Sequence, residues 1–188
     1  MFKKLIFILT LFLFSFSSNI KSKERSTMIM KLKNGDVKIE LFDDVAPNHV
    51  KRVKTLADSG KYDGVAFHRV IDGFMAQTGD VKFGNTKVDF NAQMVGTGGS
   101  EFPDLKAEFN NIPHQRGVLS MARSQSPDSA NSQFFICFDS HPHLDRNYTA
   151  FGRVVSGMEF IDKIKKGAPG SGVVDKPDII SLIINFET

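Results

Sequence analysis

Apolar and polar residues alternate along most of the chain beyond an apolar N-terminal stretch, and this two-residue period predicts many short β-strands. The run TMIMKLKNGDVKIELF contains two extended segments around Asn34-Gly35, a dipeptide typical of a two-residue hairpin turn. Residues 65–79 also have a strand pattern, with a turn near Asp72-Gly73. Further strands are expected in the runs GVLSMA, SQFFICF, YTAFGRVV and DIISLIINF.

Two segments instead have the spacing of amphipathic helices. The run APNHVKRVKTLADSG has a proline suited to a first helical position, an apolar stripe through Val50 and Val53, and Gly60 at its end. A shorter helix is expected around Met158 and Ile161. Many short strands with only two helices favour a mainly β fold, a closed antiparallel barrel whose open ends the helices cap.

The first 18 residues, MFKKLIFILTLFLFSFSS, follow a different pattern. Two lysines precede an apolar run from Leu5 to Phe16, whose 12 residues are too few for a membrane span of about 20. A charged start followed by an apolar centre is typical of a secretory signal. We therefore expect a signal peptide over 1–26, a folded domain over 27–188, and export, to the periplasm if the source is a Gram-negative bacterium. The alternative is an uncleaved anchor that tethers the domain to a membrane.

The composition agrees with one globular domain. Of the 188 residues, 41% are hydrophobic and 24% are charged, which is ordinary for such a domain. The formal net charge is +3, but the first 26 residues carry five basic side chains against one acidic side chain, so the remainder has a net charge of −1. The domain therefore offers no electrostatic basis for binding nucleic acid. Cys137 is the only cysteine, which excludes an internal disulfide, and its apolar neighbours predict a buried structural thiol.

The sequence gives little support to three common kinds of catalytic site. Five histidines are present, but the HPH triplet at 141–143 lacks the spacing of a zinc site, so no metal is expected. The run GTGGSE lacks the Lys-Ser/Thr of a phosphate-binding loop and predicts a tight turn. Ser120, in LSMAR, lacks the G-x-S-x-G setting of a hydrolase nucleophile.

The run FHRVIDGFMAQTGD poses a sharper question, because it places a positive charge in a strand of apolar residues. On an ideal strand Arg69 shares its face with Phe67 and Ile71. An arginine in a strand usually lies on a solvated face, whereas one on an apolar face must be hydrogen-bonded or reach water. Two large apolar residues and the uncharged amide of Gln77 follow it.

Together, FHRVIDGFMAQTGD and GVLSMARSQSPDSANSQFFI resemble the cyclophilin family of peptidyl-prolyl cis-trans isomerases, in a form common among bacterial members. The resemblance extends from about Met28 to the C-terminus. It implies an eight-stranded antiparallel barrel capped by two helices, and an enzyme that isomerises X-Pro bonds in proline-containing peptides and in unfolded or folding protein clients. It implies no cofactor, and we expect a monomer.

The resemblance also implies roles for particular residues. It assigns catalysis to Arg69 and Gln77. It assigns substrate binding to ten further residues: Phe74, Met75, Ala122, Arg123, Ser124, Gln133, Phe135, His143, Leu144 and Tyr148. Residues 122–124 match the segment whose backbone binds the peptide before the proline. His143 stands where many members have Trp and Tyr148 where many have His, so we expect weak binding of cyclosporin.

A proline-binding chaperone without catalysis is the alternative function. Such a protein would share the apolar pocket and the peptide groove. Arg69 distinguishes the two functions, because binding alone requires no positive hydrogen-bond donor at the amide nitrogen, whereas catalysis of rotation does. The sequence therefore favours the enzyme.

Overall fold

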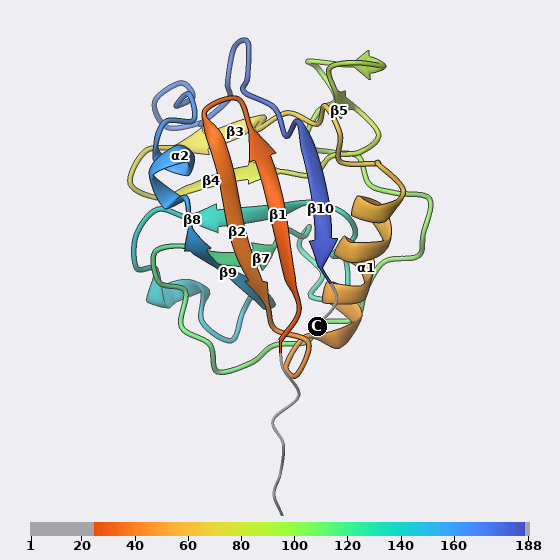
Figure 1. Ribbon diagram of the computed structural model, residues 1–188, viewed down its shortest axis with the longest axis vertical. Coiled ribbons are helices and arrows are strands. Elements are labelled where there is room, and N and C mark those ends of the chain that lie inside the picture. The colour runs from red at the N-terminus through yellow and green to blue at the C-terminus, as the bar shows by residue number, and fades with distance from the viewer. Residues whose placement is uncertain (1–24, 187–188) are drawn as a thin grey trace, which may run out of the picture.

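The computed structural model describes residues 25–186, and one eight-stranded antiparallel sheet dominates it (Figure 1). The strands of this sheet are β1 (Thr27–Leu32), β2 (Gly35–Leu41), β3 (Arg69–Ile71), β4 (Met75–Thr78), β7 (Val118–Met121), β8 (Phe134–Cys137), β9 (Ala150–Ser156) and β10 (Leu182–Phe186). Their order in the sheet is β10-β1-β2-β9-β7-β8-β4-β3. A second, two-stranded sheet contains β5 (Gly84–Asn85) and β6 (Asp89–Phe90). The helices are α1 (Pro47–Asp58), α2 (Met158–Asp162) and the 3₁₀-helix η1 (Pro142–Leu144).

Local sequence signals are confirmed where they act over a few residues. The β1–β2 hairpin turns at Lys33-Asn34, one residue earlier than the dipeptide indicated, because Gly35 already pairs with Leu32. Helix α1 begins at Pro47, and its buried side chains include both predicted valines. The predicted fold class, mainly β with two α-helices, is confirmed.

The expectation of a closed barrel is wrong. The sheet is curled but open, with β10 and β3 as its two edges. The chain that crosses the gap makes only isolated bridges, Ala66 to Ile179 and Arg69 to Val173. Lys176 has a positive φ of 51°, and the Pro177 that follows it has no N–H to donate, so this crossing segment does not form a regular strand.

The main core lies inside the curl of the sheet and under α1. Its fully buried members include Met28, Ile39 and Phe151 from the sheet and Leu56 from α1. Strands β7 and β8 are buried on both faces, which explains why their sequences do not alternate: β8 is entirely apolar, and Ser120 is the one polar residue of β7. The second face of β8 belongs to the site described below.

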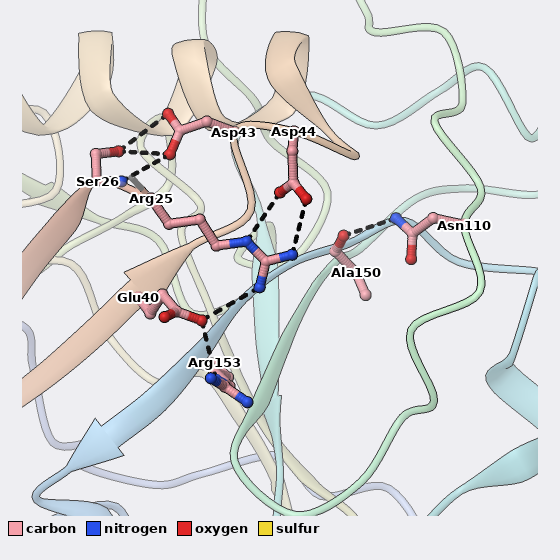
Figure 2. Close-up of polar contacts among 8 residues, drawn as sticks. All are labelled: Arg25, Ser26, Glu40, Asp43, Asp44, Asn110, Ala150 and Arg153. Carbon is pink, nitrogen blue, oxygen red and sulfur yellow. Dashed lines mark hydrogen bonds and ion pairs between the residues drawn. The ribbon is translucent and has the colours of Figure 1, made fainter. Parts of the chain in front are cut away.

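The N-terminal end of the fold is held by a polar cluster (Figure 2). The Arg25 guanidinium donates to both carboxylate oxygens of Asp44 at 2.9 Å and to Glu40 at 3.3 Å, and the Ser26 backbone and hydroxyl donate to Asp43. The guanidinium also lies over the Phe42 ring, 4.4 Å from its centroid. The apolar part of the predicted signal peptide lies outside the described residues. No helix among residues 25–186 is long and apolar enough to span a bilayer.

Candidate active site

The β3–β4 hairpin places Arg69 directly across from Gln77. The Arg69 Nη1 atom lies 3.5 Å from Gln77 Oε1 and 3.9 Å from Met75 Sδ, and its Nε donates to the Ser171 carbonyl at 3.2 Å. Arg69 and Ile71 are half-buried, whereas Val70 between them is buried in the main core. The arginine therefore lies on the face of the strand that points away from that core.

Phe67 does not share this face, contrary to the alternation expected from the sequence. It packs in the main core, as Val70 does. The regular strand begins only at Arg69, so the two-residue period does not extend back to Phe67.

A second, smaller apolar cluster lies beside Arg69, separate from the main core. Its buried members are Met75, Phe135, Cys137 and Leu144, and Ile71, Phe74, Ala122 and Tyr148 pack against them. The pairing of β4 with β8 creates this cluster, because Met75 pairs with Cys137 and Gln77 pairs with Phe135. Burial raises the pKa of the Cys137 thiol to about 12, so this cysteine is a wall of the cluster and no nucleophile.

Two amide side chains connect Arg69 to a neighbouring loop. Gln77 Nε2 donates to Gln133 Oε1 at 3.0 Å. Gln133 Nε2 in turn donates to the carbonyls of Gly98 at 2.7 Å and Gly96 at 3.1 Å. The chain of donors and acceptors directs the Gln77 carbonyl oxygen toward the guanidinium, since its amide nitrogen is occupied by Gln133.

Residues 122–124 follow β7 along the rim of the cluster. The Ala122 N–H donates to the Gln133 carbonyl, which fixes this segment against β8. The Arg123 guanidinium lies over the Tyr148 ring and donates to the backbone carbonyls of Ser124, Gln125 and Asn147. Its side chain thus shapes the rim.

The segment from 141 to 148 closes the other side of the cluster. Leu144, in η1, is buried, whereas its neighbour His143 is exposed. The centroids of the His143 and Phe74 rings are 6.0 Å apart, and the Tyr148 and Phe135 rings meet edge to face with centroids 5.8 Å apart. The residues assigned by the resemblance therefore lie around one apolar cluster with Arg69 at its edge, except Ser124, which continues the rim beyond Arg123.

Sequence reasoning missed a buried polar chain beneath this cluster. His114 Nδ1 lies 3.0 Å from Asp145 Oδ1, its Nε2 lies 2.9 Å from the Ser120 hydroxyl, and its ring stacks against Phe135. The arrangement resembles an Asp-His-Ser triad, but Ser120 is fully buried and meets no substrate. Burial lowers the pKa of His114, against the opposing effect of Asp145. No local motif revealed this chain, because Asp145 lies 31 residues from His114 in the sequence.

A second missed residue is Asp80, which is fully buried. Its carboxylate accepts the backbone N–H groups of Lys82, Phe83, Gly96 and Gly98. A Cβ on Gly98 would lie 2.4 Å from Asp80 Oδ1, which explains the need for glycine there. The only available signal was a glycine-rich run downstream of an aspartate that follows a predicted strand.

The loop that Asp80 holds borders a hollow of about 630 Å³ next to the apolar cluster. Ala122 borders both the cluster and the hollow, and the hydrogen-bonded pair Gln77 and Gln133 beside Arg69 also lines the hollow, so the hollow continues the site. Residues 96–100, expected only as a tight turn, form one wall. Among residues 25–186 no group of three or more His, Cys, Asp or Glu side chains is arranged to hold a metal ion.

Comparisons with known proteins agree with this geometry. The family model described as cyclophilin type peptidyl-prolyl cis-trans isomerase/CLD matches residues 27–184. A probable peptidyl-prolyl cis-trans isomerase of Brucella suis biovar 1 is 59% identical over 165 residues, which are 87% of this chain and 84% of the relative. A peptidyl-prolyl cis-trans isomerase of Helicobacter pylori strain J99 is 41% identical over 154 residues, covering 80% of this chain and 87% of the relative.

Solved structures give the same result. The cyclophilin AquaCyp293 of Hirschia baltica superposes with a TM-score of 0.71 at 26% identity, covering 86% of this chain and 74% of that one. A Cryptosporidium parvum cyclophilin, crystallised in the presence of the dipeptide Ala-Pro, superposes with a TM-score of 0.73 at 29% identity, covering 86% of this chain and 99% of that one. The chain therefore belongs to the family of cyclophilin-type peptidyl-prolyl cis-trans isomerases.

Proposed function

We propose that this cyclophilin-type isomerase accelerates rotation about X-Pro bonds by stabilising the twisted amide with Arg69. Rotation is slow because resonance gives the C–N bond partial double-bond character, with a barrier of about 18–20 kcal/mol. The two isomers of an X-Pro bond differ by only about 0.5–1 kcal/mol, and no bond is made or broken. An enzyme therefore needs only to bind the twisted amide more tightly than the planar one.

Arg69 is suited to this task by its position. In the twisted amide the proline nitrogen regains its lone pair and can accept a hydrogen bond, which the planar nitrogen does not. The contacts to Ser171, Gln77 and Met75 orient the guanidinium at the edge of the apolar cluster. Arginine has five N–H donors, so these contacts leave donors for a substrate. A charge-assisted bond contributes about 1.5–3 kcal/mol, or roughly 10- to 150-fold in rate.

The apolar cluster supplies the remaining requirements. Met75, Phe135 and Leu144 form a site for the proline ring, which holds the ring while the preceding residue turns. The same side chains exclude water from the amide, and the planar amide loses more solvation because it is the more charge-separated state. No general base takes part, since no proton is transferred. Arg69 beside Gln77 at the edge of this cluster is the observation that carries the proposal.

A direct test compares catalysis with binding. The purified protein should increase the cis-trans exchange rate of a short Ala-Pro peptide, measured by exchange NMR, at concentrations where it binds the peptide. A non-catalytic proline-binding chaperone would shift peptide resonances without changing the exchange rate, and that outcome would establish the alternative.

Export is a second part of the proposal. The charged and apolar start of the chain supports a signal peptide over 1–26, with the periplasm as destination in a Gram-negative cell. Fractionation with N-terminal sequencing should find a mature chain that starts between about Ser18 and Thr27. A full-length chain in the membrane fraction would establish the tethered alternative, and one in the cytoplasm would refute export.

The partners follow from the same site. The substrates are proline-containing segments of unfolded or folding clients, because the cluster recognises a proline ring and little else. We propose a monomer, because Arg69, Gln77 and the apolar cluster of one copy already form the site and need no residue from a second copy. Size-exclusion chromatography with light scattering tests this, and a stable dimer would contradict it.

A further inference from the structure

The loop between the Asp80-bound residues projects from the body and exposes apolar side chains. This segment, residues 84–95, contains β5 and β6, and we call it the tongue; it projects at the upper right of Figure 1. Val88 is 83% exposed, Met94 is 42% exposed and Phe90 is 37% exposed. Apolar side chains exposed singly need no explanation, but three large ones on one short projecting segment are typical of an interaction site.

The tongue is held in place by hydrogen bonds at its base. Thr86 donates through both its backbone N–H and its hydroxyl to the Gly64 carbonyl, and Asn85 donates to the Asp63 carbonyl. Asn91 N–H donates to the Phe83 carbonyl across the small sheet. The apolar side chains are therefore presented by an ordered segment, and a partner pays little ordering entropy on this side of the contact.

The tongue is continuous with the active site. It begins immediately after Phe83 and ends immediately before Gly96, and both of these residues line the 630 Å³ hollow. The hollow shares Gln77 and Gln133 with the catalytic site, and Gln133 donates to the Gly96 carbonyl. A polypeptide bound at Arg69 can thus pass through the hollow and reach the tongue.

The direction of that polypeptide follows from the opposite wall. Residues 122–124 line the hollow, and the cyclophilin resemblance assigns them to the part of the substrate before the proline. The hollow is lined by side chains of both signs of charge, Lys82, Arg123 and Asp104, so it has no strong preference for a charged segment. The only strong preference on this path is for the apolar side chains that the tongue can cover.

We propose that the tongue binds an apolar segment of an unfolded client several residues N-terminal to the isomerised proline. This inference rests on the proposed function, because it assigns a substrate class to the same site. Folded proteins bury such apolar segments, whereas unfolded chains expose them, so the tongue directs the enzyme toward unfolded polypeptides. Short peptides end before they reach it.

The test uses the full chain and three 12-residue peptides with one proline each. One peptide carries Leu and Phe four to seven positions before the proline, one carries them after it, and one has Ser and Gln instead. Exchange NMR gives kcat/KM for each peptide and for a tetrapeptide. The wild type should prefer the first peptide over the other two by roughly five- to tenfold, from partial burial of one or two apolar side chains.

The variant Val88→Ser/Phe90→Ser/Met94→Ser should lose this preference and keep full activity on the tetrapeptide. The single variant Val88→Ser should lose part of it. A matched control, Val155→Ser/Leu182→Ser, removes exposed apolar side chains of β9 and β10 that do not line the hollow and should behave as wild type. Equal kcat/KM for all three long peptides, a preference for the C-terminal peptide, or an unchanged preference in the triple variant overturns the proposal. If the wild type does not accelerate isomerisation of the tetrapeptide, the proposed function itself is overturned.

Discussion

Replacing Arg69 by Ala removes the proposed donor to the twisted amide while leaving the apolar cluster in place. The lost charge-assisted bond is worth about 1.5–3 kcal/mol, so kcat/KM should fall by roughly 10- to 150-fold. Because that bond forms only in the transition state, kcat should fall while KM stays near its original value. Folding should change little, since the fold loses mainly the bond from Arg69 to the Ser171 carbonyl. One such bond contributes about 1 kcal/mol, which is about 2–4 °C in Tm for a chain of this size.

The assay is cis-trans exchange of a short Ala-Pro peptide, with thermal melts of each variant in parallel. Arg69→Lys should also isomerise the peptide more slowly than the wild type, because one ammonium group does not reproduce the planar guanidinium that Ser171 and Gln77 orient. Arg153→Ala is the matched control, since Arg153 pairs with Glu40 on the sheet and lies outside the active site. A loss of activity below tenfold in Arg69→Ala, at an unchanged Tm, would refute the mechanism.

Three further predictions concern other parts of the molecule. His143→Trp should tighten cyclosporin binding by roughly 30- to 150-fold, from one hydrogen bond and the cover of a larger ring, with little change in turnover; titration of isomerase activity checks this, and equal inhibition of both forms contradicts it. Asp80→Ala should lower the free energy of unfolding by about 3 kcal/mol or more, because four backbone N–H groups lose a charged acceptor. The control Asp89→Ala, on the exposed tongue, should change this free energy little, and urea denaturation measures both variants. Burial lowers the pKa of His49, His68 and His114 below 6.5, so these side chains bind protons more readily in the unfolded chain than in the folded one. The free energy of unfolding should therefore fall as the pH decreases below 6.5. A flat profile of this free energy against pH, measured by urea denaturation, would contradict the prediction.

Local signals predicted the elements of the fold, and long-range pairing decided their assembly. The turn at Asn34 and the helix start at Pro47 depend on residues within a few positions, and both are present. Closure of the sheet depends on whether the segment that crosses from β3 to β10 forms a regular strand. The positive φ of Lys176 followed by Pro177 prevents this, and the alternation of apolar and polar residues does not reveal that positive φ.

In the site, too, contacts between residues close in the sequence could be predicted, and contacts between distant residues could not. Arg69 and Gln77 are brought together by a short hairpin, so their proximity follows from the run that contains both. Phe135 and Leu144 were assigned by resemblance, because no local pattern connects them to Arg69. Asp80 and His114 were missed: their partners lie at Gly96, Gly98 and Asp145, and such contacts are visible only once the chain has folded. Buried polar residues that hold loops have no periodic signature.

The position of β1 between β2 and β10 has a consequence for the order in which the protein is made. The first strand of the domain pairs with its last, from Thr27 with Phe186 to Lys31 with Leu182. At a synthesis rate of about 5–20 residues per second, β10 emerges roughly 8–30 s after β1. During that interval the outer edge of β1 has no partner from its own chain, and the sheet cannot be completed. The sheet of the newly made polypeptide therefore stays incomplete until β10 has been synthesised, and the edge of β1 is open to other chains throughout that interval.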